Sequence, residues 1–376
     1  MKTRRIGLVR RKLVLPRFLA GLASLLGTVL AAGCSTSVPP AVSRDSSARP
    51  REALPSGTTQ LRGAGATFPS LLYKRWFSIY HDTNPTVYIT YDAVGSSEGI
   101  RRFVGKDVSE EEQVAFGGSD AALSDAQIAE AGNNVLMIPA TAGCVVLAYH
   151  LPRFSGELKL SRKAYTGIFL GEVRNWNDPL ITQSNPGVTL PNLSIVTIVR
   201  QDGSGTTFAF TNHLNAISDD WRARFGPATL VNWPGDAMRA KGSEGVAGLI
   251  QKSEGSIGYV GNEFARRIGL NVASLENKDG NFIRPSDQGC EKALATAEIP
   301  EDLRAFAPDP PGADSYPIVT FSWILLHKTY KNASDAEAVR KLFQWSLQDG
   351  QRYASELGYV ALPAEIAKRA LAALSP

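Results

Sequence analysis

The sequence predicts an α/β fold with two lobes, from two observations. Short apolar runs rich in β-branched residues, of which residues 193–199 are the clearest, alternate with segments whose apolar residues recur at helical spacing. Gly- and Ser-rich turns join each run to the segment that follows it. A chain of 376 residues, with 43% hydrophobic and 20% charged side chains, is also long enough to bury the cores of two lobes.

Residues 1–33 predict a signal peptide for export. They contain seven Lys or Arg and no acidic residue, and the uncharged apolar run at 18–32 is short for a membrane span. Residues 30–34 read Leu-Ala-Ala-Gly-Cys and resemble a bacterial lipobox, although the leucine stands four residues before the cysteine instead of three. We therefore expect a lipid on Cys34, which would anchor the protein to the periplasmic or cell-surface face of a bacterial membrane; a simple cleaved signal is the alternative.

Residues 34–60 predict a flexible tether, because they are rich in Ser, Pro, Arg and Thr and have almost no apolar periodicity. We expect the folded part to begin at Leu61. Without residues 1–33 the chain has 33 basic and 36 acidic residues, a net charge of −3. This balance does not favour a nucleic-acid-binding or membrane-binding face, so an anionic ligand would have to be held by local donors.

Two cysteines remain after Cys34. Cys144 lies in the apolar run 140–148, which favours a buried thiol. Export also permits a disulfide with Cys290, so both states stay open. No spacing of Cys and His residues indicates a metal site, and we expect no cofactor.

The turn at residues 200–207, Arg-Gln-Asp-Gly-Ser-Gly-Thr-Thr, has the chemistry of an anion site. Ser204, Gly205 and Thr206 open the helix predicted after the strand at 193–199, and the unpaired N–H groups of a helix start suit an anion. Ser204 and Thr206 add hydroxyl donors, and Arg200 adds a planar cation that matches a tetrahedral oxyanion. An ordinary capped turn could have the same sequence, so the decision depends on whether similar turns recur.

Three further turns repeat this chemistry before predicted helices or after predicted strands. Thr67 and Phe68 precede a helix that Pro69 opens, and Ser96 and Ser97 stand at the start of a helix that follows the strand at 86–91. The strand at 114–120 ends in Asp120, whose alternative role is to cap a helix at 121–124.

Six stretches of the sequence resemble the phosphate-binding protein of the bacterial phosphate ABC transporter: residues 63–69, 94–97, 116–121, 199–208, 241–246 and 255–260. The resemblance extends from about Leu61 to the C-terminus. It implies a type II periplasmic-binding-protein fold, in which two lobes joined by two crossing strands close on the ligand. It also implies an extracytoplasmic protein that is not an enzyme and that delivers hydrogen phosphate to the permease subunits of an importer.

The resemblance assigns roles to particular residues. It implies phosphate contacts from Thr67, Phe68, Ser96, Asp120, Arg200, Ser204, Gly205 and Thr206. It further implies that Asp202 orients Arg200. Two features depart from the family pattern, namely Glu98 and a longer acidic loop at 107–112.

The predicted lobes follow from the same resemblance and from two apolar strands. We expect lobe 1 to comprise residues 61–147 and 318–376, and lobe 2 to comprise residues 148–317. The strands at 145–149 and 318–326 would be the crossings, and helices are expected at 336–347 and 365–374.

Two alternative functions remain. The same fold could bind another oxyanion, such as sulfate or molybdate. Asp120 favours phosphate, because an ionised carboxylate only accepts hydrogen bonds and hydrogen phosphate, unlike sulfate, has a proton to donate. Residues 95–99 also fit the Gly-x-Ser-x-Gly pattern of serine hydrolases. Ser97 would then act with His150, His213 or His327, none of which lies in a motif.

Overall fold

The computed structural model describes residues 57–105 and 107–374. Nine of the strands in these residues form one continuous sheet. These residues all belong to one structural unit of the chain, Leu54–Pro376. The predicted signal peptide, Cys34 and all but the last residues of the predicted tether lie outside them. The strands run in the order β2 (Val87–Ala93), β1 (Thr59–Gly65), β3 (Phe116–Ser119), β12 (Val319–His327), β4 (Val135–His150), β8 (Ser256–Gly261), β6 (Val196–Arg200) and β7 (Met238–Ala240), and β9 (Asn271–Val272) pairs with β4.

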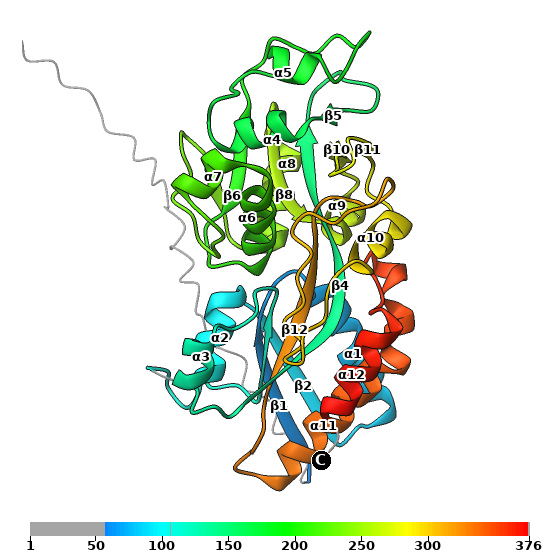
Figure 1. Ribbon diagram of the computed structural model, residues 1–376. Helices are drawn as coiled ribbons and strands as arrows, with labels where there is room; N and C mark the ends of the chain where they lie inside the picture. Colours follow the sequence, from blue (N-terminus) through cyan, green and yellow to red (C-terminus); the bar gives the residue numbers. More distant parts are fainter. Residues whose placement is uncertain (1–56, 106, 375–376) are drawn as a thin grey trace, which may run out of the picture. The chain divides into compact units, whose positions relative to one another are not determined.

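Strand β4 connects the two halves of this sheet. Residues Val135–Cys144 pair antiparallel with β12, whereas Val145–His150 pair antiparallel with β8. Nearly all of β4 is buried, because this strand belongs to both halves. We name the half with β1, β2 and β3 lobe 1 and the half with β6, β7 and β8 lobe 2; β4 and β12 run between them (Figure 1). The boundary expected after residue 147 falls within β4.

Helices cover both halves. Those of lobe 1 are α1 (Ser70–Thr83), α2 (Ser96–Val104), α3 (Asp125–Glu130), α11 (Ala333–Leu347) and α12 (Ala364–Leu374), with the 3-10 turns η1 (Asp349–Tyr353) and η2 (Ser355–Leu357). Those of lobe 2 are α4 (Arg162–Phe169), α5 (Pro179–Thr182), α6 (Gly205–Ile217), α7 (Asp219–Arg224), α8 (Gly242–Lys252), α9 (Asn262–Ile268) and α10 (Asp287–Leu294). A small sheet of β5 (Lys159–Leu160), β10 (Ser274–Glu276) and β11 (Phe282–Ile283) also belongs to lobe 2.

Several elements differ in detail from the expectation. Strand β1 begins at Thr59, two residues before the expected start of the fold. The strand expected at 193–199 is confirmed but spans Val196–Arg200. The prediction of a helix at 121–124 is wrong, because α3 begins only at Asp125. The Ser124 hydroxyl caps this helix by accepting from the backbone N–H of Gln127.

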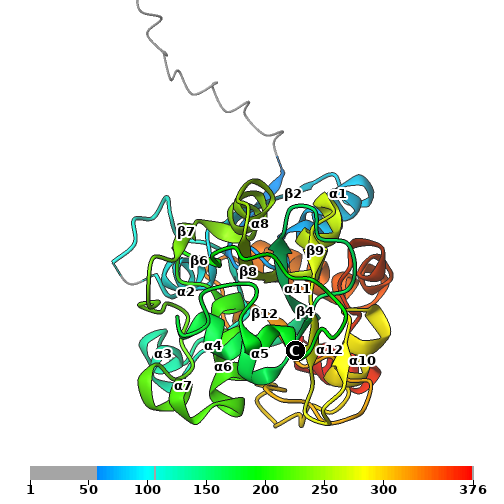
Figure 2. The same cartoon turned by 90° about the horizontal axis from the view of Figure 1, so that it is seen from above.

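Cys144 and Cys290 form a disulfide, with their Cα atoms 5.8 Å apart. Of the two states that the sequence leaves open, the structure therefore has the disulfide. It ties α10 to β4 at the residue after which β4 changes its pairing partner from β12 to β8. Helices α6 and α10 lie on opposite sides of the crossing strands (Figures 1 and 2).

No helix in the described part of the chain combines the length and the apolar character needed to cross a membrane.

Candidate functional site

The candidate site residues of lobe 1 lie at one edge of the sheet. Strand β1 pairs parallel with both β2 and β3, so the carboxyl ends of all three strands meet at the same edge. Thr67 follows β1, Ser96 opens α2 shortly after β2, and Asp120 directly follows β3. All three side chains are buried. Local sequence therefore places each residue at a strand end, and parallel pairing brings the strand ends together.

Lobe 2 contributes the turn between β6 and α6. Ser204 is the N-cap of α6, and its Oγ accepts from the backbone N–H of Thr207 at 3.1 Å. Gly205 and Thr206 form the first turn of the helix, as the sequence predicts. The Thr206 hydroxyl is buried, forms no hydrogen bond of normal geometry among the described residues, and lies beside the Asp120 carboxylate. A buried hydroxyl without such a bond is uncommon, and here it adds a donor to the helix start.

The two lobes contact each other through these turns. Ser96 Oγ accepts from the backbone N–H of Gly205 at 3.0 Å and from that of Asp120 at 3.3 Å. A Cβ atom on Gly205 would lie 2.5 Å from Asp120 Cβ, so only glycine permits this approach. The backbone N–H of Ser97 donates to Gly203 O across the same contact, at 3.1 Å. The structure thus brings Ser96, Asp120 and Gly205 into direct contact.

Arg200 is the buried cation of the site, with 2% of its surface exposed. Its Nε donates to Asp202 Oδ1 at 2.9 Å, and its Nη2 donates to Asp202 Oδ2. Asp202 Oδ1 also accepts from Gly242 N at the start of α8, at 2.9 Å. Burial opposes ionisation of Asp202, but the hydrogen bonds and charge of Arg200 outweigh it and lower its pKa. Asp202 therefore remains a carboxylate that fixes the orientation of the guanidinium.

Asp120 is the second carboxylate of the site and is 1% exposed. Its Oδ1 accepts from Ser322 Oγ at 2.7 Å. Burial raises the pKa of Asp120 to about 7, while the Ser322 hydrogen bond, the charge of Arg200 and the neighbouring Thr206 hydroxyl limit the rise. The alternative role, capping of a following helix, is wrong because no helix starts there.

Thr67 and Phe68 occupy different environments. Thr67 Oγ1 lies 2.8 Å from Ser243 Oγ and accepts from Ser243 N at 3.1 Å, which is a third contact between the lobes. The Phe68 ring is fully buried and packs edge-on against Tyr359, whose hydroxyl donates to Phe68 O at 2.6 Å. The Phe68 side chain is therefore part of the core, and a ligand contact from this residue would come from its backbone.

Sequence reasoning assigned no role to Ser243, Tyr259 or Ser322. Ser243 stands in the first turn of α8, so its signal was another hydroxyl residue at a helix start. The Tyr259 hydroxyl accepts from Arg200 N at 3.1 Å and lies 2.7 Å from Thr207 Oγ1. Ser322 interrupts the apolar strand β12, and a lone serine there gave no usable signal.

The surroundings of Glu98 explain how an acid is accommodated near the site. Arg101 and Arg102 each donate to the Glu98 carboxylate at 2.8 Å. The pKa of Glu98 is lowered to about 2, and the largest cause is its hydrogen bonding to Arg101. The acidic loop contacts the same cluster, since Arg101 also donates to Asp107 O. The negative charge of Glu98 is thus matched locally by two cations.

The geometry does not assemble a serine hydrolase. Ser97 Oγ donates to Thr229 Oγ1 at 3.3 Å. His213 instead contacts Tyr165 and Pro308, and the His327 ring stacks on Phe103. His150 lies at the lobe 2 end of β4, where it pairs with Ser256 of β8. The described residues also contain no group of three or more His, Cys, Asp or Glu placed to hold a metal ion.

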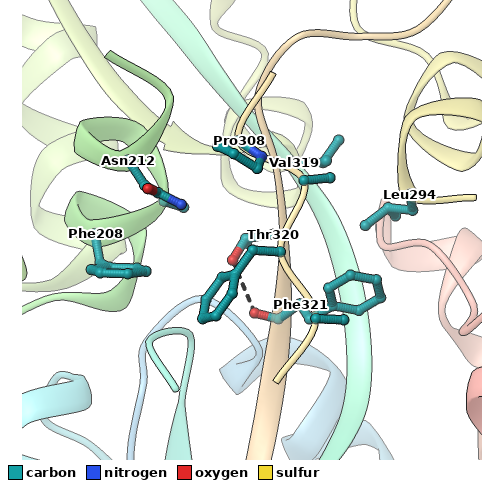
Figure 3. A pocket seen from close by; sticks show the side chains of 11 residues that line it. Phe208, Asn212, Leu294, Pro308, Val319, Thr320 and Phe321 are labelled. Atoms are coloured by element: carbon teal, nitrogen blue, oxygen red, sulfur yellow. Dashed lines mark hydrogen bonds between the residues drawn. The ribbon is translucent and has the colours of Figure 1, made fainter. Parts of the chain in front are cut away.

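A small cavity lies next to the site, between α6, β12 and the segment 305–308 (Figure 3). Phe208 and Asn212 line it from α6, and Thr320 lines it from β12, with the Thr320 hydroxyl donating to Phe321 O at 2.9 Å. Its volume of about 10 Å³ has room for about one water molecule. The cavity is therefore too small to be a second ligand site.

Comparisons with known proteins agree with this geometry. Residues 52–349 match the model of the PBP superfamily domain. The phosphate-binding protein PstS of Pasteurella multocida is 36% identical over 320 residues, which are 84% of this chain and 90% of that protein. The chain belongs to this family of phosphate-binding proteins. PstS of Methanocaldococcus jannaschii is 34% identical over 347 residues, which are 85% of this chain and 86% of that protein.

Solved structures of phosphate-binding proteins show the same fold. A periplasmic phosphate-binding protein, PfluDING, solved with bound phosphate, superposes with a TM-score of 0.69 at 21% identity, over 84% of this chain and 93% of that one. A phosphate-binding protein from Stenotrophomonas maltophilia gives 0.67 at 19% identity, over the same shares of both chains. The type II periplasmic-binding-protein fold with two lobes is thereby confirmed.

Proposed function

We propose that the protein binds inorganic phosphate, as hydrogen phosphate, between its lobes and delivers it to the permease subunits of an ABC importer. The observation that supports this is the convergence at one place of a helix start, a buried oriented arginine and a buried carboxylate. The proposed ligand set comprises Thr67, Phe68, Ser96, Asp120, Arg200, Ser204, Gly205 and Thr206.

The chemistry of the set fits a protonated oxyanion. The helix start and the hydroxyls of Ser204 and Thr206 offer hydrogen bonds to anionic oxygens, and Arg200 supplies the compensating charge. Asp120 in its ionised form would accept the remaining ligand proton. Asp202 acts on Arg200 and does not itself face the ligand.

The proposal extends to the arrangement of the whole chain. We propose the lobe limits 61–147 with 318–376, and 148–317, as the bodies that move about the crossing strands. Ligand contacts from both lobes favour the closed state, because the open state cannot make them all. We further propose that export and a lipid on Cys34 hold the protein outside the cytoplasm, beside its importer. The relatives are phosphate-binding transport proteins, so we propose no enzymatic activity.

Calorimetry tests the ligand. Phosphate should bind, whereas sulfate and molybdate should bind far more weakly; preferred binding of sulfate or molybdate would overturn the choice of anion. Arg200→Ala should abolish useful binding, because loss of one partner in a buried charged pair typically costs roughly 2–5 kcal/mol. Asp202→Ala should weaken binding less. Equal phosphate affinity of Arg200→Ala and the parent would contradict the proposed site.

Separate measurements test closure, anchoring and the absence of catalysis. Small-angle scattering should show compaction on addition of phosphate, and an unchanged profile at saturation would count against closure. Radioactive palmitate should label the parent in bacteria but not the Cys34→Ser variant. Labelling of Ser97 by a fluorophosphonate probe would revive the hydrolase alternative.

A further inference from the structure

Ser322 contacts the proposed selectivity residue, Asp120, from the crossing strand β12. Both residues are buried, with 0% and 1% of their surfaces exposed, and Ser322 Oγ donates to Asp120 Oδ1 at 2.7 Å. The pairing of β12 with β4 shifts register between Ser322 and Trp323. Register irregularities of this kind often re-aim a side chain beside a functional site. The fold therefore directs one hydroxyl at one oxygen of Asp120.

This hydrogen bond has a definite chemical consequence. A serine hydroxyl has one hydrogen, and donating it to Oδ1 favours the ionised form of Asp120. Oδ2 is then the oxygen left to accept a proton from a ligand. An ionised Asp120 can only accept, so it rejects an oxyanion without a proton, whereas a protonated Asp120 can donate and would tolerate sulfate. Selection against sulfate thus depends on the protonation state of Asp120.

The other groups that act on Asp120 have different roles. Arg200 and the Thr206 hydroxyl also favour ionisation, but both belong to the proposed ligand set. Glu263 on α9 interacts electrostatically with Asp120; its two carboxylate oxygens are buried without a partner among the described residues, and burial raises its pKa well above the ordinary value. A negative charge on Glu263 would oppose ionisation of Asp120, so Glu263 does not favour the ionised form in either state. The remaining titratable neighbours are tyrosines whose pKa values are raised by burial, and these are Tyr73, Tyr91 and Tyr359. Ser322 is therefore the group that favours ionised Asp120 without being assigned to the ligand.

We propose that Ser322 is a positioning residue that sets the pH above which the site distinguishes hydrogen phosphate from sulfate. The inference rests on the proposed function. Selection of hydrogen phosphate over sulfate is then controlled by a residue of the crossing strand β12, which lies 202 positions from Asp120 in the sequence. Above this pH Asp120 accepts the ligand proton, and below it Asp120 donates to any oxyanion.

The test compares the parent with Ser322→Ala by calorimetry with phosphate and with sulfate, from pH 5 to pH 9. A hydrogen bond to a charged group has a strength that corresponds to roughly one to two pH units. The pH below which sulfate binding appears should rise by that amount in Ser322→Ala. Phosphate affinity at pH 9 should change less than tenfold. Sulfate rejection with the same pH dependence in both proteins would overturn the proposal.

Two further variants and one spectroscopic measurement make the test decisive. Tyr316→Phe removes another buried hydroxyl, which has no hydrogen-bond partner among the described residues and is not among the groups that act on Asp120, and should keep the parent's pH profile. Ser322→Thr retains the donor and should also keep it. Carboxyl ¹³C NMR of the ligand-free protein follows Asp120 directly. Its titration should lie roughly one to two pH units higher in Ser322→Ala than in the parent; the same titration in both proteins would overturn the proposal. A parent that binds no phosphate would overturn the proposed function, while the NMR titration would still decide the effect of Ser322.

Discussion

Asp120→Asn should remove a pH dependence from the stability of the ligand-free protein. Burial raises the pKa of Asp120 from 3.8 to about 7. A folded state that holds a proton more tightly than the unfolded state is most stabilised below the unfolded pKa, and this stabilisation is lost as the pH rises through the folded pKa. The free energy of unfolding of the parent should therefore fall between about pH 4 and pH 7 on account of this residue, and the asparagine variant should lack that fall.

The size of the effect follows from the shift. The pKa rises by about three units, and each unit corresponds to 1.36 kcal/mol, so the predicted loss is about 4 kcal/mol. Because Asp120 is 1% exposed, solvent screening reduces this figure little. The amide of Asp120→Asn also changes hydrogen bonding, but it does so equally at every pH. The prediction therefore concerns how the difference in the free energy of unfolding between variant and parent changes with pH.

Denaturant unfolding at pH 4.5, 6 and 8 measures this difference. The buffers must be free of phosphate, because a ligand that binds only the folded state adds stability of its own. Asp236→Asn, which removes an exposed carboxylate from the same lobe as Arg200, is the matched control. If the parent and Asp120→Asn lose stability in parallel between pH 4.5 and pH 8, the burial argument for Asp120 is refuted.

Three other changes have predictable outcomes. Gly205→Ala should lower phosphate affinity at least tenfold, because its Cβ would meet backbone atoms of the opposite lobe at under 3 Å; Gly248→Ala, whose Cβ would meet nothing within 4 Å, should leave the calorimetric affinity unchanged. Replacing Cys144 and Cys290 together by alanine should lower stability by about 2–5 kcal/mol in chemical unfolding, since the bond closes a loop across a sequence separation of 146 residues. A double variant as stable as the parent would contradict this. The pKa of Glu263 is raised by burial, so the parent should lose stability as the pH rises above about 4.5. Glu263→Gln should therefore gain melting temperature relative to the parent from pH 5 to pH 8, and equal losses in both would speak against a buried neutral acid.

The turn chemistry of this protein was readable from the sequence because it is local. The Ser204 side chain caps α6 by bonding to a residue three positions later, and Arg200 pairs with Asp202, two positions later. Such contacts depend on backbone geometry that a short stretch specifies, namely a strand end, a glycine-rich turn and a helix start. The motifs of the family further indicated which turns meet, as the contacts of Ser96 with Gly205 and Asp120 show.

The tertiary structure alone decided the contacts between distant residues. Ser322 reaches Asp120 only because β12 pairs with β3 in one register, and a slip by one residue would turn the side chain to the other face of the sheet. The same holds for Thr67 with Ser243, 176 residues apart, and for the disulfide, which composition and export left open. Asp120 was also assigned a capping role as its alternative, since Asp is a common N-cap, but the chain continues without a helix there and the carboxylate bonds to a strand instead. The sequence by itself therefore determined the donors that each turn offers, because these follow from residue types and short spacings. Strand register and lobe packing decide which distant acceptor, hydroxyl or sulfur each residue contacts. No local sequence pattern specifies them.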